Sequence, residues 1–398
     1  MSPSEADVRL AISSVEDPDL RRGLAELGMI GRIEAHRRRT TVEILVPAQG
    51  WSGADELAER VTSELSAARA GGPWPEPHVD MRVMTDVERE ELLRRLSAPR
   101  GGEPARVAPP TAAKLPHTPG GPPGPIGHEE GRPNRFMIPG SRTRVIGISS
   151  GKGGVGKSSV TVNLAVALSA MGREVGVLDA DVYGFSVPGM LGVERDPAAI
   201  GDLLVPPVVH GVRVLSMGFF VPDDQPVIWR GPMLHKALEQ FLVDAYWGEP
   251  DYLLIDMPPG TGDVALSLGQ YLPRTEVVVV TTPQLAAQRV AQRSALAART
   301  LKLPVRGVIE NMSWFTGDDS KRYELFGAGG GEALSQSLGV PLLGKLPFVT
   351  EVRHAADVGV PVAVSDPDGE AAGAFRDLAK QLDSLGPSRI YKSELAVR

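Results

Sequence analysis

The sequence of 398 residues contains no cysteine, so it cannot form a disulfide, hold zinc through thiolates or use a catalytic thiol. Positive charge is also scarce, because 42 Lys and Arg against 49 Asp and Glu give a net charge of −7 and no overall basic field for nucleic acid or anionic membrane. No apolar run approaches the ~18 residues of a membrane span, and Met1–Asp7 lacks the basic and apolar parts of a signal peptide. We therefore expect a soluble, cytoplasmic protein without a nucleic-acid or membrane partner.

One glycine-rich stretch has a defined setting. It follows the short apolar run Arg144–Ser149, fits G-x-x-x-x-G-K-[ST] and leads into the helical periodicity of Ser158–Met171. Glycines let backbone N–H groups approach phosphates, and the N-terminus of a helix favours anions. Lys157 would reach the β- and γ-phosphates, and the Ser158 hydroxyl would ligate Mg²⁺. The expected nucleotide-binding residues in this loop are Gly151, Lys152, Gly153, Gly154, Val155, Gly156, Lys157, Ser158 and Ser159.

The loop carries a second lysine, Lys152. One lysine already serves the bound phosphates. We therefore expect Lys152 to act on the nucleotide of a second subunit, across the interface of a homodimer. This KGGVGK form resembles the deviant P-loop class that includes MinD, ParA, nitrogenase iron protein and the Mrp/ApbC proteins.

A carboxylate ends the apolar strand Leu253–Ile255. Asp256 is in the Walker B arrangement and would hold Mg²⁺, through water, beside the P-loop; the alternative is a simple helix cap. The run Pro258–Asp263 follows. It can bring the N–H of Gly260 near a γ-phosphate and change shape when that phosphate leaves, as a switch.

A second carboxylate site follows Val177 and Leu178. In-line hydrolysis needs a water placed behind the γ-phosphorus. By resemblance, Asp181 would orient that water and Asp179 would support the Mg²⁺ shell; the alternative is a turn-forming pair. Lys152, Lys157 and Asp181 are thus the candidate catalytic residues.

Asn311 ends a later strand, and its amide offers one donor and one acceptor that can match the adenine edge. In the resembling family this position contacts the base; the alternative is a structural Asx-turn. Because no N-K-x-D guanine motif occurs, ATP is favoured over GTP.

Composition divides the chain. Residues 1–97 read as a small α/β domain, and residues 98–140 hold 11 prolines and 8 glycines in 43 positions, above the roughly 25–30% that indicates disorder. Residues 141–387 alternate strands and helices, which predicts a doubly wound, mainly parallel sheet, and 388–398 form a tail. We expect domains that are tethered rather than fused. Predicted strands are 29–35, 41–46, 78–84, 144–149, 174–179, 212–217, 251–256, 276–281, 305–311 and 342–346; predicted helices include 8–13, 20–27, 54–68, 87–96 and 283–301.

Several motifs in order resemble the Mrp/ApbC family over almost all of residues 141–385. They are GKGGVGKSS, DADVYGFSVP, DMPPGTGD, ENMSWF, the glycine run 326–331 and ADVGVP at 356–361. The resemblance implies a dimeric ATPase that carries iron–sulfur clusters to apoproteins, with assembly proteins or apoprotein clients as partners. Asp17–Leu20 and Leu27–Ile30 resemble the small domain that accompanies iron–sulfur assembly factors. Its usual cysteine is missing from the turn Val46–Trp51, so we expect a docking or specificity module.

The ligands for a cluster are missing. The family's C-x-x-C lies between ENMS and the glycine run, where this chain has Phe315–Ser320. Clusters need thiolate, occasionally with imidazole. Asp318 and Asp319 suit Mg²⁺ or Ca²⁺, or are simply solvated, and His235 and His354 are best explained as structural. Either partners supply the cluster ligands or the cargo differs.

Two other functions are open. A MinD/ParA-like positioning ATPase would place a C-terminal amphipathic helix on the membrane, and Phe375, Leu378, Leu382 and Leu385 do line one face. The opposite face lacks a basic excess, so docking on its own domain explains the pattern better. The other is a nucleotide-gated regulator whose N-terminal domain binds a protein partner, with no cluster.

Overall fold

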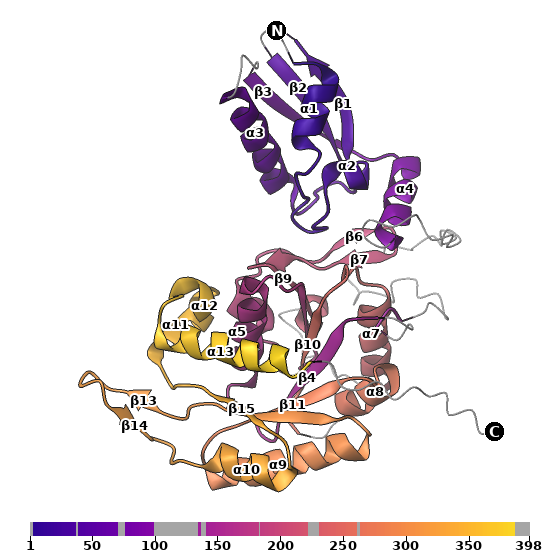
Figure 1. Ribbon diagram of the computed structural model, residues 1–398. Helices are drawn as coiled ribbons and strands as arrows, with labels where there is room; N and C mark the ends of the chain where they lie inside the picture. The colour runs from indigo at the N-terminus through magenta and orange to yellow at the C-terminus, as the bar shows by residue number, and fades with distance from the viewer. Residues whose placement is uncertain are drawn as a thin grey trace, which may run out of the picture.

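The computed structural model describes residues 3–36, 39–70, 76–98, 134–136, 141–182, 184–221, 231–260 and 263–386. They form a small N-terminal domain and a larger α/β domain (Figure 1). Apart from residues 98 and 134–136, the predicted linker lies outside the described residues, and so does the predicted tail.

The N-terminal domain is a three-stranded sheet in the order β1-β2-β3 with helices packed on it. β1 and β2 are antiparallel, and β2 and β3 are parallel. The N–H of His36 donates to the carbonyl of Arg39 at 2.9 Å, next to the last register pair of β1 and β2. The elements are α1 (Glu5–Ile12), α2 (Leu24–Leu27), β1 (Ile30–Ala35), β2 (Arg39–Val46), α3 (Ala54–Ala70), β3 (Glu76–Val83) and α4 (Asp86–Ser97).

The helix predicted over 20–27 is wrong in its first half, since α2 begins only at Leu24. The Asp17 carboxylate accepts hydrogen bonds from the N–H groups of Asp19 and Leu20, at 3.0 and 2.8 Å. A side chain that bonds the backbone two and three residues ahead competes with helical pairing, and the segment turns instead.

The larger domain has an eight-stranded sheet in the order β15-β12-β11-β4-β10-β5-β9-β8, parallel except for β8, which confirms the doubly wound prediction. Its strands are β4 (Arg144–Ser150), β5 (Val175–Asp179), β8 (Val208–Val209), β9 (Val212–Ser216), β10 (Tyr252–Asp256), β11 (Glu276–Thr281), β12 (Val305–Glu310) and β15 (Leu342–Lys345). Smaller ribbons are β6 (Ala198–Ile200) with β7 (Leu203–Val205), and β13 (Phe315–Thr316) with β14 (Arg322–Tyr323).

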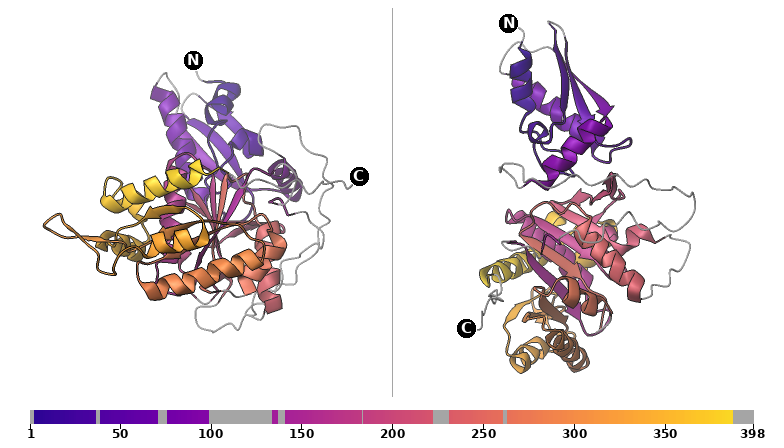
Figure 2. Two further views of the ribbon diagram at one scale, coloured as in Figure 1. Left: turned by 60° about the horizontal axis from the view of Figure 1, so that its bottom comes forward. Right: turned by 90° about the vertical axis from the view of Figure 1, so that its right-hand side faces the viewer.

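Helices cover both faces of this sheet (Figures 1 and 2). The strand residues alternate between them: Val278 and Val280 face one core, and Val277 and Val279 face the other. Burial on both faces explains the unbroken apolar runs. One face carries α5 (Lys157–Ala170), α6 (Val187–Leu191), α11 (Thr350–Val358), α12 (Val362–Ser365) and α13 (Glu370–Ser384); the other carries α7 (Gly231–Val243), α8 (Asp263–Tyr271), α9 (Leu285–Thr300) and α10 (Gly330–Leu338).

The C-terminal helix α13 docks on its own domain, as expected. Phe375, Leu378 and Leu382 are at most 2% exposed and belong to the core that includes α5. Their apolar surface is therefore not available to a membrane. Within the described part of the chain, no helix has the length and apolarity needed to cross a bilayer.

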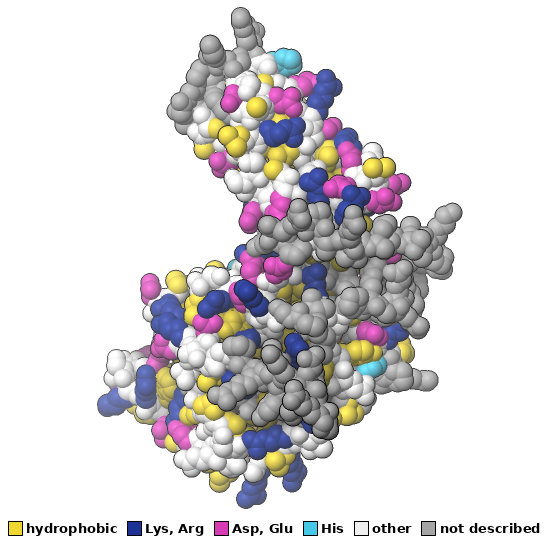
Figure 3. Space-filling view, turned by 45° about the vertical axis from the view of Figure 1, so that its right-hand side comes forward, with side chains coloured by type: hydrophobic (Ala, Val, Ile, Leu, Met, Phe, Trp, Pro, Cys, Tyr) yellow, Lys and Arg dark blue, Asp and Glu magenta, His cyan; other side chains and the backbone are white. Residues whose placement is uncertain are grey.

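The two domains are in contact, so the expectation of domains that are only tethered is wrong. Ile200, Val205 and Tyr246 of the larger domain belong to the hydrophobic core of the N-terminal domain. Polar contacts accompany them, because the Arg21 guanidinium donates to the Gly211 carbonyl at 2.9 Å and lies 3.2 Å from the Glu174 carboxylate. On the side of the N-terminal domain that Figure 3 shows, basic and acidic side chains are interspersed, so this side presents no field of one sign.

Candidate nucleotide-binding site

Three neighbouring strands bring the predicted site together. β4 pairs with β10 and β10 pairs with β5, all parallel, so their carboxyl ends lie side by side. Asp256 is the register partner of Asp179, and on its other side it is paired with Ile148, just before the glycine loop. Loops at the carboxyl ends of parallel strands are where such sheets bind ligands.

Glycine is required at several points of the P-loop. Gly154 and Gly156 have φ of 79°, a left-handed conformation that side chains disfavour. A Cβ on Gly151 would lie 2.2 Å from the carbonyl carbon of Val290 and 2.3 Å from the amide nitrogen of Ala291, so the loop is packed flush against the backbone of α9. α5 begins directly after Gly156, at Lys157.

Lys157 and Asp256 form the centre of the site. The Lys157 Nζ lies 2.7 Å from an Asp256 carboxylate oxygen and 3.9 Å from the Asp181 carboxylate. Asp256, which is fully buried, also accepts hydrogen bonds from the hydroxyls of Ser158 at 2.6 Å and Thr161 at 2.8 Å. Its oxygens thus bind the first turns of α5, which argues against the helix-cap alternative. Sequence reasoning missed Thr161, because a threonine inside a periodic helix matches no motif.

Asp179 organises the second carboxylate loop. Its oxygens accept from the Ser216 hydroxyl at 3.1 Å and from the backbone N–H groups of Asp181, Ser186 and Val187 at 3.1 to 3.2 Å. Burial, with the charge of Asp256 adding to it, raises the pKa of Asp179 to about 7 although the backbone donors and Lys157 oppose this shift. Because the chain's own donors already occupy Asp179, its role in a Mg²⁺ shell stays a prediction.

Asp181 lies at the edge of this loop, 8% exposed, and accepts the N–H of Gly184 at 3.1 Å. Its second oxygen is the one near Lys157. The structure thus brings Lys157, Ser158, Asp179, Asp181 and Asp256 together, whereas Lys152 points elsewhere, with its Nζ 3.4 Å from the Gln284 amide oxygen on the surface.

Gly260 and Asn311 have contacts that the motifs did not indicate. The N–H of Gly260, at φ 95°, donates to the Ser150 carbonyl at 3.0 Å, so a phosphate contact requires this bond to break. The Asn311 amide nitrogen donates to the Val155 carbonyl at 2.9 Å and braces the P-loop, leaving its oxygen for any contact with a base. Their proposed contacts with nucleotide stay predictions.

The donors present fit Mg²⁺. Ser158 and Asp256 supply hard oxygens beside the P-loop, and Mg²⁺ is held by one or two carboxylates together with substrate phosphates. Among the described residues no group of three or more His, Asp or Glu side chains forms a metal site by itself. The phosphate oxygens of a nucleotide would therefore have to complete the coordination.

The hairpin β13–β14 stands where the family's cysteines are expected. The Glu370 carboxylate fastens its base by accepting from the Trp314 indole at 2.9 Å, the Thr316 hydroxyl at 2.7 Å and the Arg322 guanidinium at 3.2 Å. Asp319 accepts from the Tyr323 hydroxyl at 2.9 Å, as a turn residue does.

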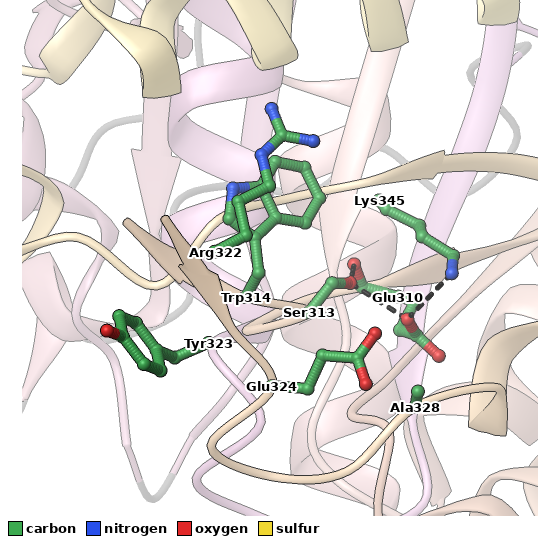
Figure 4. Close-up of a pocket in the computed structure, with 8 residues that line it drawn as sticks. All are labelled: Glu310, Ser313, Trp314, Arg322, Tyr323, Glu324, Ala328 and Lys345. Carbon is green, nitrogen blue, oxygen red and sulfur yellow. Dashed lines mark hydrogen bonds and ion pairs between the residues drawn. The ribbon is translucent and has the colours of Figure 1, made fainter. Parts of the chain in front are cut away.

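A cavity of about 440 Å³ lies under this hairpin, and Figure 4 shows Arg322 over the Trp314 indole and Lys345 beside Glu310. The cavity is lined by Glu310, Ser313, Trp314, Arg322, Tyr323, Glu324, Ala328 and Lys345. His235 does not line this cavity. Its Nδ1 pairs with the Ser267 hydroxyl at 3.0 Å, and its ring packs against the Tyr271 ring at a centroid distance of 4.2 Å, tilted by 34°, as a structural histidine would.

A family model described as "ParA: NUBPL iron-transfer P-loop NTPase" matches residues 141–383. The chain belongs to this family. Curated relatives of this NUBPL-type chain are named iron–sulfur cluster carrier proteins: that of Mycobacterium bovis is 41% identical over 386 residues, covering 95% of this chain and 93% of its own. That of Bacillus subtilis is 35% identical over 383 residues, covering 96% and 97%.

A solved structure supports the same fold. A nucleotide-binding protein of Archaeoglobus fulgidus in complex with ADP is 32% identical to this NUBPL-type chain and has a TM-score of 0.50. The likeness covers 59% of this chain and 93% of that one.

Proposed function

We propose that this protein is a Mg²⁺-dependent, homodimeric ATPase of the cytoplasm that delivers iron–sulfur clusters to apoproteins, with the thiolate ligands supplied by its partners. The convergence of Lys157, Asp181 and Asp256 on the P-loop carries the ATPase part of the proposal. The names of the relatives support the carrier part. Neither nucleic acid nor membrane is needed for this role.

In hydrolysis, the oxygen of a water attacks the γ-phosphorus and the bond to the ADP oxygen breaks, so the protein contributes placement and charge stabilisation. Lys157 would leave its contact with Asp256 to bind phosphate oxygens, since both are anionic partners for one ammonium. Asp181 would orient the attacking water. Ser158 and Asp256 would hold Mg²⁺, which when bound neutralises charge on the phosphates.

The cluster is cargo, and this chain cannot hold it through sulfur. A chain without cysteine offers no thiolate. We therefore propose that donor and client proteins keep the cluster ligated while this protein brings them together in an ATP-dependent way.

An anaerobic transfer assay tests the proposal. A donor loaded with a [4Fe–4S] cluster is mixed with an apoprotein client, and transfer is followed by absorbance with and without this protein and Mg-ATP. We expect faster transfer with the wild type and no acceleration with Lys157→Ala. The carrier role fails if the wild type neither binds a cluster nor alters transfer.

A second candidate is a nucleotide-gated binder of proteins that handles no cluster. The cysteine-free hairpin, fastened by Glu370 beside a cavity, favours this reading. It predicts ATP-dependent partner binding together with unchanged cluster transfer in the same assay.

A further inference from the structure

The turn Asp17–Arg21 of the N-terminal domain is built to be rigid. Asp17 and Asp19 are at most 1% exposed. Asp17 accepts the Trp51 indole N–H at 3.1 Å in addition to its two backbone bonds, and Asp19 accepts the Ser52 hydroxyl at 2.7 Å. The Asp19 carboxylate is thus a buried anion, held in a fixed position where the N-terminal domain meets the ATPase domain.

Two arginines of the ATPase domain contact this turn, one at the Asp19 carboxylate and the other at backbone carbonyls. The Arg195 guanidinium donates to the other oxygen of the Asp19 carboxylate, the one that Ser52 does not bind, at 3.2 Å. Arg213, 3% exposed, donates to the backbone carbonyls of Asp19 and Leu20 and lies over the ring of Tyr246. A charged group that is buried must be paired, so these contacts fix the position of both partners.

Both arginines belong to chain segments that hold the Asp179–Asp181 loop. Arg195 follows α6, whose N-cap Ser186 and first residue Val187 donate their N–H groups to the Asp179 carboxylate. Arg213 lies on β9, which ends at Ser216, the hydroxyl donor to the same carboxylate. The segment 184–195 is therefore anchored at one end by Asp179 and near the other by Asp19.

We propose that Arg195 is a positioning residue for ATP hydrolysis: bound to Asp19 of the N-terminal domain, it fixes the segment 184–195, whose Gly184 N–H donates to the Asp181 carboxylate. This rests on the proposed function. When the anchor is lost, the segment gains freedom and Asp181 no longer holds the attacking water in place, whereas Lys157 and the P-loop still bind nucleotide. Small misplacement of a positioned group reduces turnover strongly.

Another ion pair across the same boundary provides a matched control. Arg21 and Glu174 are 27% and 30% exposed, and the Arg195 side chain is 28% exposed. Glu174 and Gly211, the residues that Arg21 contacts, precede β5 and β9 at the ends of the strands remote from Asp179. Arg21→Gln therefore weakens domain docking without touching the anchored segment.

The experiment compares wild type, Arg195→Gln, Arg195→Lys and Arg21→Gln in the full chain. We expect Arg195→Gln to lower kcat about three- to tenfold with KM and the Kd of ATP within about twofold. Arg195→Lys keeps the charge and should recover most of the loss, and Arg21→Gln should match the wild type. Equal losses in Arg195→Gln and Arg21→Gln, or no loss in Arg195→Gln, overturn the proposal.

Hydrogen exchange without nucleotide provides a readout that does not depend on hydrolysis. We expect faster exchange at the amides of Ser186 and Val187 in Arg195→Gln only. If the wild type hydrolyses no ATP, the proposed function fails, and exchange alone then decides whether Arg195 anchors the segment: unchanged protection of these amides refutes it.

Discussion

Gly151→Ala tests whether close packing of the P-loop on α9 sets the shape of the phosphate cradle. The added Cβ would lie 2.2 to 2.5 Å from three backbone atoms of Val290 and Ala291, and ordinary contact begins at 3.4 Å. Helix backbone cannot rotate aside, so the loop and α9 must separate by about 1 Å. Overpacking of this kind costs about 1–3 kcal/mol of stability, and a displacement of that size at a catalytic group can cost about 10²-fold in rate.

Two glycines of the same loop are the controls. Gly153 has no atom within 4 Å of its would-be Cβ, and Gly154 has equally open space but a φ of +79°. Gly153→Ala should therefore leave ATP affinity and stability unchanged. Gly154→Ala should lose about 1–2 kcal/mol of stability through backbone strain alone.

The assay is calorimetric titration with Mg-ATP, together with melting temperatures measured with and without nucleotide. We expect Gly151→Ala to lose the most ATP affinity and to melt several degrees lower, about 2–4 °C for each kcal/mol. If Gly151→Ala binds ATP like the wild type, or if all three variants lose affinity equally, packing on α9 does not set the shape of the phosphate cradle.

Further predictions concern the charged groups. Lys157→Ala should weaken ATP binding by about 10²-fold or more in titrations, since it removes the ammonium from the cradle. Asp181→Asn should leave the Kd of ATP within about twofold and slow phosphate release at least about 10²-fold; parallel loss of binding would contradict a role in water placement. Lys152→Ala should spare binding to the monomer and hinder ATP-driven dimerisation in sedimentation, so equal loss of both would exclude a role across the interface. Burial raises the pKa of Asp17 to about 6 from 3.8, so the native state holds its proton more tightly and stability should fall by about 3 kcal/mol as pH rises from about 4 to about 6. Asp17→Asn should lack this component in urea titrations, and an identical pH profile would refute it.

Much of the fold follows from the sequence, because strands buried on both faces are apolar throughout. β11 has the predicted bounds, and β4 and β10 differ from theirs by a residue. The helix predicted at 20–27 was too long, because the turn before α2 depends on one side chain, Asp17, which accepts hydrogen bonds from the backbone two and three residues ahead.

The site was predictable where a motif carries it and not elsewhere. Lys157 and Asp256 belong to recognisable local patterns. Thr161 and Ser216 become part of the site only through contacts with Asp256 and Asp179, which strand order creates. Asn311 shows the same limit: its motif suggested a base contact, whereas its bond to Val155 depends on how two distant loops meet.

The apolar cluster that joins the domains has a consequence for melting. Ile200, Val205 and Tyr246 are at most 4% exposed, within a core supplied mainly by the other domain. If either domain unfolds, apolar surface of the other domain becomes exposed to water. We therefore expect a single calorimetric unfolding peak in place of two. If the two domains were produced separately, each would expose an apolar patch that promotes aggregation.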